Sequence, residues 1–371
     1  MRGAVRDIMS AVMTESYGNP SSTHAMGRQA KAALDTARGN VAGVLGADAS
    51  DVYFTSGGTE ADNWAVLRGA DSMSRHGRHI ISTRIEHDAV LKPLAILEKS
   101  GWEVTYLTPG KSGRITAEAF ASALREDTIL ASVILVNNET GAINPVEEMT
   151  REVKRRGFHT LFHTDAVQGF IKTPFTVKSL GADMISVSAH KLHGPKGAGA
   201  LYIRKGVKLK PLIYGGGQER DMRSGTEALP AISGFGEAVR LASAEREQTA
   251  AAVREVYAET VSLLRDKLPE VVILSPDNSG ESHSPYILSI SLPGYKSEVL
   301  MNCLEAEGIC VAKSSACKKG GRSHVLEAMK LPNDIIDGAL RVSFSRYSTT
   351  EEAAYFAEKL SSAAKKLYKV L

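Results

Sequence analysis

The alternation of short apolar runs with helical patterns is the feature that most constrains the fold of this chain. A run that is apolar throughout is typical of a strand buried on both faces, as in a parallel sheet covered by helices. Residues 61–67 and 146–156 show helical patterns between such runs. The alternation therefore predicts an α/β fold with a mainly parallel sheet. The predicted strands cover residues 52–55, 79–82, 104–107, 129–136, 160–164 and 184–187.

The pattern changes near residue 236, where Ala, Glu, Arg and Leu become frequent. We predict a large α/β domain over residues 1–235 and a smaller α+β domain over residues 236–371. Thr349 and Glu352 have the spacing of a capping box, which predicts a last helix that starts at Thr349 and runs toward Leu371. The other elements predicted in this part are a long helix over 237–268, strands over 286–292 and 340–345, and a helix over 298–305.

Composition and charge restrict the class of protein. The chain has 371 residues, of which 43% are hydrophobic and 23% charged, as is ordinary for a globular protein. A formal net charge of +3 gives no reason to expect binding to nucleic acid or to an anionic membrane. Three cysteines in so long a chain argue against a disulfide framework. No apolar run is long enough to span a bilayer, and residues 1–7 lack the apolar core of a signal peptide, so we expect a cytoplasmic protein.

Two candidate residues follow predicted strands at the sheet edge where α/β proteins bind ligands. Lys191 comes directly after the strand over 184–187, where partial desolvation would make its amine reactive. Asp165 ends the strand over 160–164, and a buried carboxylate there needs a partner, such as the protonated pyridine nitrogen of pyridoxal phosphate (PLP). The spacing between them is about one strand–helix–strand unit, so both are expected at neighbouring strand ends. A surface lysine and a helix-capping aspartate are the alternatives.

A glycine-rich turn and a histidine are further candidates. Gly57-Gly58-Thr59 lies between a predicted strand and a predicted helix, where backbone N–H groups and the helix dipole favour a phosphate. A plain helix start is the alternative. His87 lies in a polar loop and could stack on a flat ring or move protons, although a loop histidine often does neither. His163, His190 and His193 have no nearby cysteine and match no common zinc spacing, so we expect no metal site.

The second part of the chain contains a candidate nucleophile and a candidate anion ligand. Cys317 lies in the small, polar and basic stretch 313–321, whose lysines favour the nucleophilic thiolate; an incidental cysteine in a solvated loop is the alternative. Cys303 and Cys310 have apolar neighbours in sequence and are expected to be packed as small hydrophobic residues. Arg341 lies inside an apolar strand, where its guanidinium needs a substrate carboxylate or an internal ion pair.

Taken in order along the chain, these features resemble the cysteine desulfurases of the nitrogen-fixation and iron–sulfur-cluster type. These enzymes lie within the class-V aminotransferases and the fold-type I PLP enzymes. The resemblance implies a large PLP-binding domain with a mainly parallel, seven-stranded sheet flanked by helices, and a smaller α+β domain that carries the catalytic cysteine. The matching stretches span nearly the whole chain and are Gly18-Asn19-Pro20-Ser21-Ser22 with His24, Phe54-Thr55-Ser56-Gly57-Gly58-Thr59-Glu60, Glu86-His87, Asn137-Asn138-Glu139-Thr140-Gly141, Asp165-Ala166-Val167-Gln168, Ser188-Ala189-His190-Lys191, Gly215-Gly216-Gly217-Gln218-Glu219-Arg220, Arg223-Ser224-Gly225-Thr226, Ser314-Ser315-Ala316-Cys317 and Leu340-Arg341-Val342-Ser343.

The resemblance also implies a role for each candidate residue. The enzyme would remove sulfur from L-cysteine, release L-alanine and leave a persulfide on the nucleophile Cys317. Lys191 would hold PLP covalently, and His87 would stack on its ring and move protons. The other implied ligands are Asp165 at the pyridine nitrogen, Gln168 at the ring hydroxyl, Gly58, Thr59, Ser188 and His190 at the phosphate, Thr226 at the phosphate of the neighbouring subunit, and Asn138 and Arg341 at the substrate carboxylate.

The partners implied by the resemblance are a second copy of the chain in a homodimer and a sulfur-acceptor protein, either a cluster scaffold or a tRNA-thiolation enzyme. Two alternatives stay open. One is a selenocysteine lyase or another class-V PLP enzyme, although the Ser-Ser-Ala lead into Cys317 argues against a plain aminotransferase. The other is a catalytically impaired scaffold for cluster assembly. Its support is that the sequence opens at Met1 without the Leu-Asp-Asn-Ala-Ala-Thr-Thr-Pro-like stretch with which the family begins.

Overall fold

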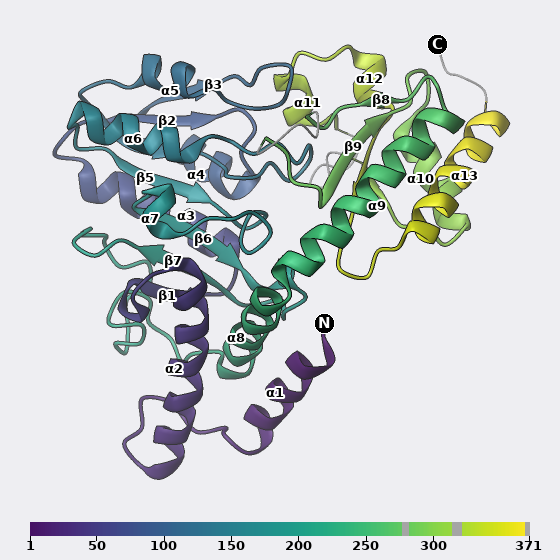
Figure 1. Ribbon diagram of the computed structural model, residues 1–371. Helices are drawn as coiled ribbons and strands as arrows, with labels where there is room; N and C mark the ends of the chain where they lie inside the picture. Colours follow the sequence, from purple (N-terminus) through teal and green to yellow (C-terminus); the bar gives the residue numbers. More distant parts are fainter. Residues whose placement is uncertain (277–281, 314–320, 368–371) are drawn as a thin grey trace. The chain divides into compact units, whose positions relative to one another are not determined.

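The computed structural model describes residues 1–276, 282–313 and 321–367. The chain forms two compact units, each built around its own sheet (Figure 1). Unit 1 consists of Met1–Leu107, Ala117–Leu135 and Pro145–Glu245. Unit 2 consists of Thr108–Thr116, Val136–Asn144 and Arg246–Leu371, so two short segments from the first half of the chain belong to it. The domain ranges 1–235 and 236–371 stay a prediction.

Unit 1 contains a seven-stranded sheet with the strand order β1-β7-β6-β5-β4-β2-β3. Four neighbouring pairs from β6 to β3 are parallel, whereas β7 runs antiparallel to both β1 and β6. All residues of the five strands β2, β4, β5, β6 and β7 are buried. The sequence analysis predicted buried strands at the first four of these and missed β7. The predicted fold class is confirmed. The strands are β1 (Val52–Thr55), β2 (His79–Thr83), β3 (Glu103–Leu107), β4 (Thr128–Ser132), β5 (Leu161–Asp165), β6 (Met184–Ser188) and β7 (Gly199–Ile203).

Helices flank this sheet (Figure 1). The helix α3 (Gly58–Met73) packs across β4, β5, β6 and β7, and its buried residues include Trp64, Ala65 and Asp62. The helices α1 (Gly3–Thr14) and α2 (Ala25–Leu45) pack against α8 (Leu229–Ala244). The other elements of unit 1 are α4 (Asp88–Lys99), α5 (Ala117–Ala123), α6 (Val146–Arg156), α7 (Val177–Leu180), and the 3-10 turns η1 (Ala49–Asp51) and η2 (Ala189–Leu192).

Two predicted elements differ from the structure. The single helix predicted over 237–268 is wrong, because the chain forms α8 and then α9 (Arg246–Lys267), with a break at Glu245. The backbone of Glu245 leaves the helical region there, and its carboxylate pairs with Arg2 Nη2 at 2.7 Å. The strand predicted over 129–136 ends at Ser132. Residues 133–136 stay buried, and after Leu135 the chain passes into unit 2.

Unit 2 contains an antiparallel sheet with the order β10-β11-β9-β8 and helices packed against it. The helix α9 buries Val253, Val256, Tyr257, Thr260 and Leu264, whose spacing places them on one face. The capping box predicted at the start of the last helix is confirmed, with Thr349 Oγ1 accepting from Glu352 N. The elements are β8 (Val272–Ile273), β9 (Ile287–Ser291), α10 (Ser297–Ala306), β10 (Ala312–Lys313), α11 (His324–Ala328), α12 (Asn333–Asp337), β11 (Ala339–Ser343) and α13 (Thr350–Lys366). None of the helices in the described ranges of the chain is long and apolar enough to cross a membrane.

Candidate functional site

The sheet of unit 1 brings several predicted residues to one edge. The strands β5 and β6 are parallel, with Asp165 opposite Ser186, so their carboxyl ends lie side by side. The strand β7 begins at Gly199, which is paired with Thr55 of β1 on one side and Ser188 of β6 on the other. The carboxyl ends of β1, β5 and β6 therefore meet at the edge where α/β sheets bind ligands.

The start of α3 at this edge fits a phosphate. Its N-cap is Gly57, which offers no side chain, so the N–H groups of residues 58–60 have no acceptor within the helix. Gly58 lies close to the side chains of Val167 and Ser188. A Cβ atom at position 58 would lie 2.7 Å from Val167 Cγ2 and 3.8 Å from Ser188 Cβ. Only a glycine leaves the backbone room for this close approach. Thr59 is exposed at the same helix start, where its hydroxyl is free to add a hydrogen bond.

Asp165 fits a cationic ring nitrogen. Its side chain is buried, and Oδ1 accepts a hydrogen bond from Val167 N at 2.9 Å. Asp165 therefore also caps the turn that follows it, which is the capping role that the sequence analysis gave as the alternative. No Lys or Arg of the described residues forms an ion pair with it. Burial, followed by repulsion from Asp62, raises the pKa of Asp165 to about 7. A protonated pyridine nitrogen would supply the missing positive charge.

Lys191 lies half-buried in η2, directly after β6. Ser188 Oγ and His190 Nδ1 form a hydrogen bond of 2.8 Å, which fixes the orientation of the imidazole of His190. Partial burial, and then the neighbouring charges of Lys191 and Lys172, hold the pKa of His190 below its usual value. Burial, and then Lys191, lower the pKa of Lys172 to about 8. Lys172 is a neighbour that the sequence did not reveal, because it lies outside every recognised stretch.

His87 caps α4, with Nδ1 accepting a hydrogen bond from Ala89 N at 3.1 Å. A neutral imidazole that accepts at Nδ1 carries its proton on Nε2, which is thus the nitrogen able to donate. Gln168 is half-buried in the turn after Asp165, and Thr226 is exposed. A positive charge on His87 would lower the pKa of Asp165, which indicates that these two residues are near each other.

A buried polar layer behind Asp165 was missed by the sequence analysis. His163 lies two residues before Asp165 on β5, and its ring contacts Ser132 Oγ at 2.8 Å and Ser186 Oγ at 2.9 Å. Asp62 of α3 hydrogen-bonds to Ser186, and its Oδ1 lies 3.5 Å from His163 Nε2. Burial raises the pKa of Asp62 to about 7. An aspartate within a helix gives no sign in the sequence that it faces a sheet.

In unit 2 the structure brings Asn138 and Arg341 together. Arg341 Nη1 donates to the backbone oxygen of Asn138 at 2.9 Å, and Arg341 Nε has no hydrogen-bond partner among the described residues. No carboxylate in the described part of the chain forms an ion pair with Arg341, in contrast to the alternative proposed. Arg341 therefore retains donors for an external anion.

The three cysteines are described unequally. Cys317 lies outside the described residues. Cys303 is half-buried on α10. Cys310 is exposed, so the expectation that it is packed as a small hydrophobic residue is wrong. It lies between the end of α10 and the short strand β10.

Comparisons with known proteins agree with this arrangement. The sequence profile of the family described as Aminotransferase class-V matches residues 3–356, and the chain belongs to this family. The chain is 42% identical to the cysteine desulfurase IscS of Methanosarcina thermophila, over 99% of this chain and 90% of that protein. It is 42% identical to the putative cysteine desulfurase IscS 1 of Bacillus subtilis (strain 168), over 95% and 92% of the two chains. A solved structure of a NifS-like protein superposes with a TM-score of 0.93 at 40% identity, covering 99% of this chain and 97% of that one.

Within the class-V family the chain is a cysteine desulfurase, since several curated relatives at about this identity carry that function over nearly their full length. Cysteine desulfurases depend on PLP in general, act on cysteine and pass its sulfur to acceptors. The resemblance stated from the sequence is thereby confirmed, as are the predicted fold class and the predicted class of enzyme.

Proposed function

We propose that this chain binds PLP in unit 1 and uses it to take sulfur from L-cysteine, with Cys317 as the acceptor thiol. The observation that carries the proposal is the edge of the unit 1 sheet. There, a buried Asp165 that forms no ion pair with a Lys or Arg of the described residues, the N–H groups at the start of α3, and Lys191 lie at adjoining strand ends. These are the three features that a ring nitrogen, a phosphate and an aldehyde would require.

In this proposal each part of the cofactor has its own ligands. Lys191 holds the aldehyde carbon covalently, Asp165 pairs with the ring nitrogen, and Gln168 contacts the ring hydroxyl. The bound cofactor supplies an electron sink for the charge that develops at Cα of the substrate. The ligands assigned to the phosphate are Gly58, Thr59, Ser188 and His190, with Thr226 reaching the phosphate of a second copy in a homodimer.

The chain's own residues then move protons and hold the substrate. Arg341 binds the carboxylate of cysteine through its unpartnered donors, and Asn138, whose backbone accepts from Arg341, completes this end. Lys191, once the amine of the substrate has displaced it, takes the Cα proton, with Lys172 as its neighbour. His87, with its proton on Nε2, stacks on the ring and carries a proton to or from the reacting sulfur and Cβ.

Sulfur transfer balances without an external oxidant. The Cys317 thiolate attacks the substrate sulfur, so an S–S bond forms and the Cβ–S bond breaks. The electron pair of the broken bond stays on carbon, which takes up a proton and becomes the methyl group of alanine. Carbon is reduced while the two sulfurs are oxidised to the persulfide level. The persulfide then passes to an acceptor protein, either a cluster scaffold or a tRNA-thiolation enzyme.

The test is an absorption spectrum of the purified protein before and after L-cysteine is added, with alanine quantified and Cys317 examined by mass spectrometry. A visible cofactor band that responds to cysteine, together with alanine and a mass gain of one sulfur on Cys317, is expected. Cys317→Ala should retain the band and lose the persulfide. Undiminished alanine from this variant would reject Cys317 as the nucleophile, and a colourless protein would favour the scaffold alternative. A preference for selenocysteine in the same assay would favour the lyase.

A further inference from the structure

A buried carboxyl group in unit 2 has no role in the reaction just proposed. Glu139 is 3% exposed and follows Asn138 directly. Its backbone is fixed by Asn137 Oδ1, which accepts from the N–H groups of Glu139 and Thr140 at 2.9 Å each. Gly141, with φ of 77°, closes the turn where any Cβ would meet His283. The segment 136–144 thus presents Glu139 in a defined direction.

Ser323 is the partner of this carboxyl group. Ser323 Oγ donates to Glu139 Oε2 and accepts from Leu326 N at 3.1 Å, so one hydroxyl both caps α11 and holds Glu139. Both side chains are buried, and this pair joins positions far apart in the sequence. Cys317 precedes Ser323 by six residues in the sequence.

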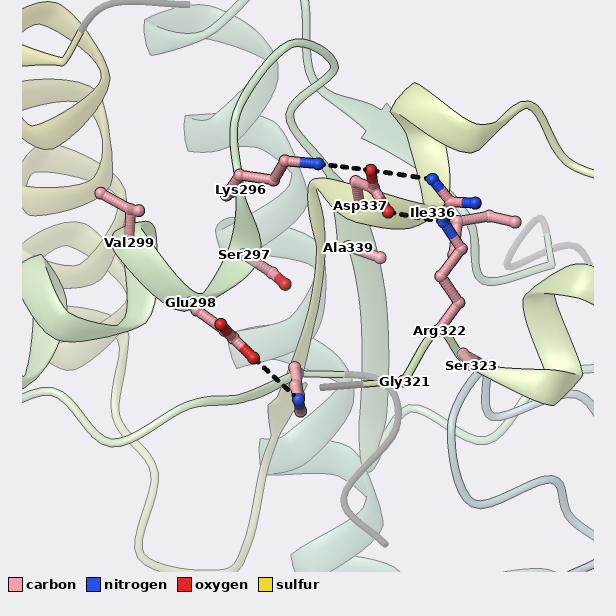
Figure 2. Close-up of a pocket in the computed structure, with 11 residues that line it drawn as sticks. Lys296, Ser297, Glu298, Val299, Gly321, Arg322, Ser323, Ile336, Asp337 and Ala339 are labelled. Atoms are coloured by element: carbon pink, nitrogen blue, oxygen red, sulfur yellow. Dashed lines mark hydrogen bonds and ion pairs between the residues drawn. The ribbon is translucent and has the colours of Figure 1, made fainter. Parts of the chain in front are cut away.

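The residues next to Ser323 are also fixed. Gly321, Arg322 and Ser323 line a pocket of about 310 Å³. Figure 2 shows Arg322 joined to Asp337, which lines the same pocket. Arg322 Nε donates to Asp337 Oδ1 at 2.7 Å, and Lys296 Nζ donates to Asp337 Oδ2 at 2.6 Å. This contact is exposed, and an exposed ion pair contributes little to stability. The buried Glu139–Ser323 hydrogen bond is therefore the stronger of the two attachments.

We propose that Glu139 is a positioning residue for sulfur transfer, because its carboxyl group fastens the segment 321–323, which follows the nucleophile in sequence, to the segment 136–144, which contacts Arg341. The inference rests on the proposed function of Cys317 and Arg341. Because six residues of chain have a limited reach, fixing Ser323 limits how far from it the thiol of Cys317 can lie, which favours reaction with the substrate. The segment 136–144 therefore contacts Arg341 through Asn138 and also holds residues 321–323 through Glu139.

The electrostatic surroundings of Glu139 agree with this role. Burial raises its pKa to about 7, whereas the hydrogen bond from Ser323 and then the charge of Arg341 lower it. Either protonation state can hold Ser323, since a carboxylate accepts from its hydroxyl and a carboxylic acid can donate to it. Glutamine keeps an acceptor oxygen in the same place, whereas alanine keeps none.

The experiment compares Glu139→Gln, Glu139→Ala and Ser323→Ala in the full holoenzyme. Glu327→Gln is the matched control, because Glu327 is an exposed glutamate on the same short helix. Three quantities are measured: the single-turnover rate of persulfide formation on Cys317, the change of the cofactor band with cysteine, and amide hydrogen exchange over residues 321–328 without substrate. Glu139→Ala and Ser323→Ala should slow persulfide formation about tenfold and speed exchange. Glu139→Gln and Glu327→Gln should stay within about twofold of wild type.

Wild-type persulfide formation and exchange in both Glu139→Ala and Ser323→Ala would overturn the inference. A loss that appears only as a raised KM or as an altered cofactor band would also overturn it, because Glu139 would then act on the substrate or the cofactor. If the wild-type protein itself forms no persulfide, the proposed function fails instead. The exchange measurement needs no substrate and still decides whether Glu139 anchors residues 321–323. Should Glu139→Ala not fold, Ser323→Ala carries the same test.

Discussion

The two units bury carboxyl groups in contrasting surroundings. In unit 1, Asp165 and Asp62 lie near each other, and neither forms an ion pair with a Lys or Arg of the described residues. In unit 2, Glu139 accepts a hydrogen bond from Ser323 and feels the charge of Arg341. Burial raises the pKa of all three groups to about 7. A raised pKa alone therefore does not tell which acid serves a ligand.

The difference lies in what each acid still lacks. Glu139 has its partner within the protein, so its arrangement is complete without any ligand. Asp165 has one hydrogen bond from Val167 and repulsion from Asp62, so a cation from outside would relieve an unfavourable charge. These surroundings agree with the proposed positioning role of Glu139 and with the proposed pairing of Asp165 with a cationic ring nitrogen. Substitutions in the two units should consequently fail in different ways.

The largest effect is expected at Asp165. Asp165→Asn removes the anion but keeps the size and the hydrogen bond to Val167, so the ring nitrogen would lose its charged partner. We expect kcat to fall by about a thousandfold, in the range typical of a lost electrostatic or proton-transfer contribution, and the cofactor to dissociate more readily. Steady-state kinetics and cofactor titration of the stripped protein measure the two. Asp165→Glu serves as the control that keeps the charge, and activity of Asp165→Asn near the wild-type level would contradict the comparison.

Arg341 should give the next largest effect and a different signature. Arg341→Ala removes the proposed partner of the substrate carboxylate, which should lower kcat/KM by about a hundredfold, mostly through KM. The absorption band of the bound cofactor should not change, because Arg341 is assigned to the substrate carboxylate and not to the cofactor, and its Nη1 donates to the backbone oxygen of Asn138. Arg341→Lys should recover only part of the loss, since it cannot bind a carboxylate in two places. A fall confined to kcat would argue against a role in binding substrate.

The sequence was sufficient to place two residues of the candidate site at strand ends. Lys191 and Asp165 could be found because a polar residue after a buried apolar run falls at a known edge of an α/β sheet. The same reasoning could not find Asp62, which lies inside α3 among residues that read as an ordinary amphipathic helix. Its importance depends on the face of the helix that meets β5 and β6, and packing decides that face.

Other features could not be predicted because they depend on contacts between residues far apart in the sequence. Glu139 lies in a recognised stretch, yet its partner Ser323 is distant in sequence and lies in no pattern of its own. The assignment of residues 136–144 to unit 2 has the same cause, because their contacts with residues such as Ser275 and His283 form only in the folded protein. At the helix break, Glu245 pairs with Arg2, a partner near the start of the chain. Local propensity carries no information about such partners.

The dependence of stability on pH offers a third test, smaller in size. The folded pKa of Asp62, about 7, lies above its ordinary value of 3.8, so its contribution to stability is complete below 3.8 and is lost as pH rises through 7. Asp62→Asn removes this loss. In the cofactor-free protein, the free energy of unfolding of the wild type relative to Asp62→Asn should therefore fall by roughly 1–2 kcal/mol between pH 5.5 and 7.5.

Denaturant unfolding at several pH values measures this difference, and taking the difference removes the contributions of the histidines that do not contact Asp62. The exposed Asp266 provides the matched control, since Asp266→Asn should give a curve parallel to that of the wild type. Added PLP should reduce the pH dependence of the free energy of unfolding. The reason is that a cation beside Asp165 offsets the repulsion between Asp165 and Asp62. Parallel curves for Asp62→Asn and wild type would mean that Asp62 does not change its charge in this range.

The smallest effect compares one capping box in each unit. Thr349 caps the 17-residue helix α13, and Thr176 caps the four-residue helix α7 by the same pair of reciprocal hydrogen bonds. Thr349→Ala should lower the free energy of unfolding by about 1 kcal/mol, the usual cost of a lost N-cap. Thr176→Ala should cost less, because little helix depends on α7, and both serine variants should be near neutral. Neither alanine variant should alter kcat or KM, since stability and chemistry depend on separate residues in each unit; a kinetic effect of Thr349→Ala would mean that α13 influences the position of Arg341 through β11.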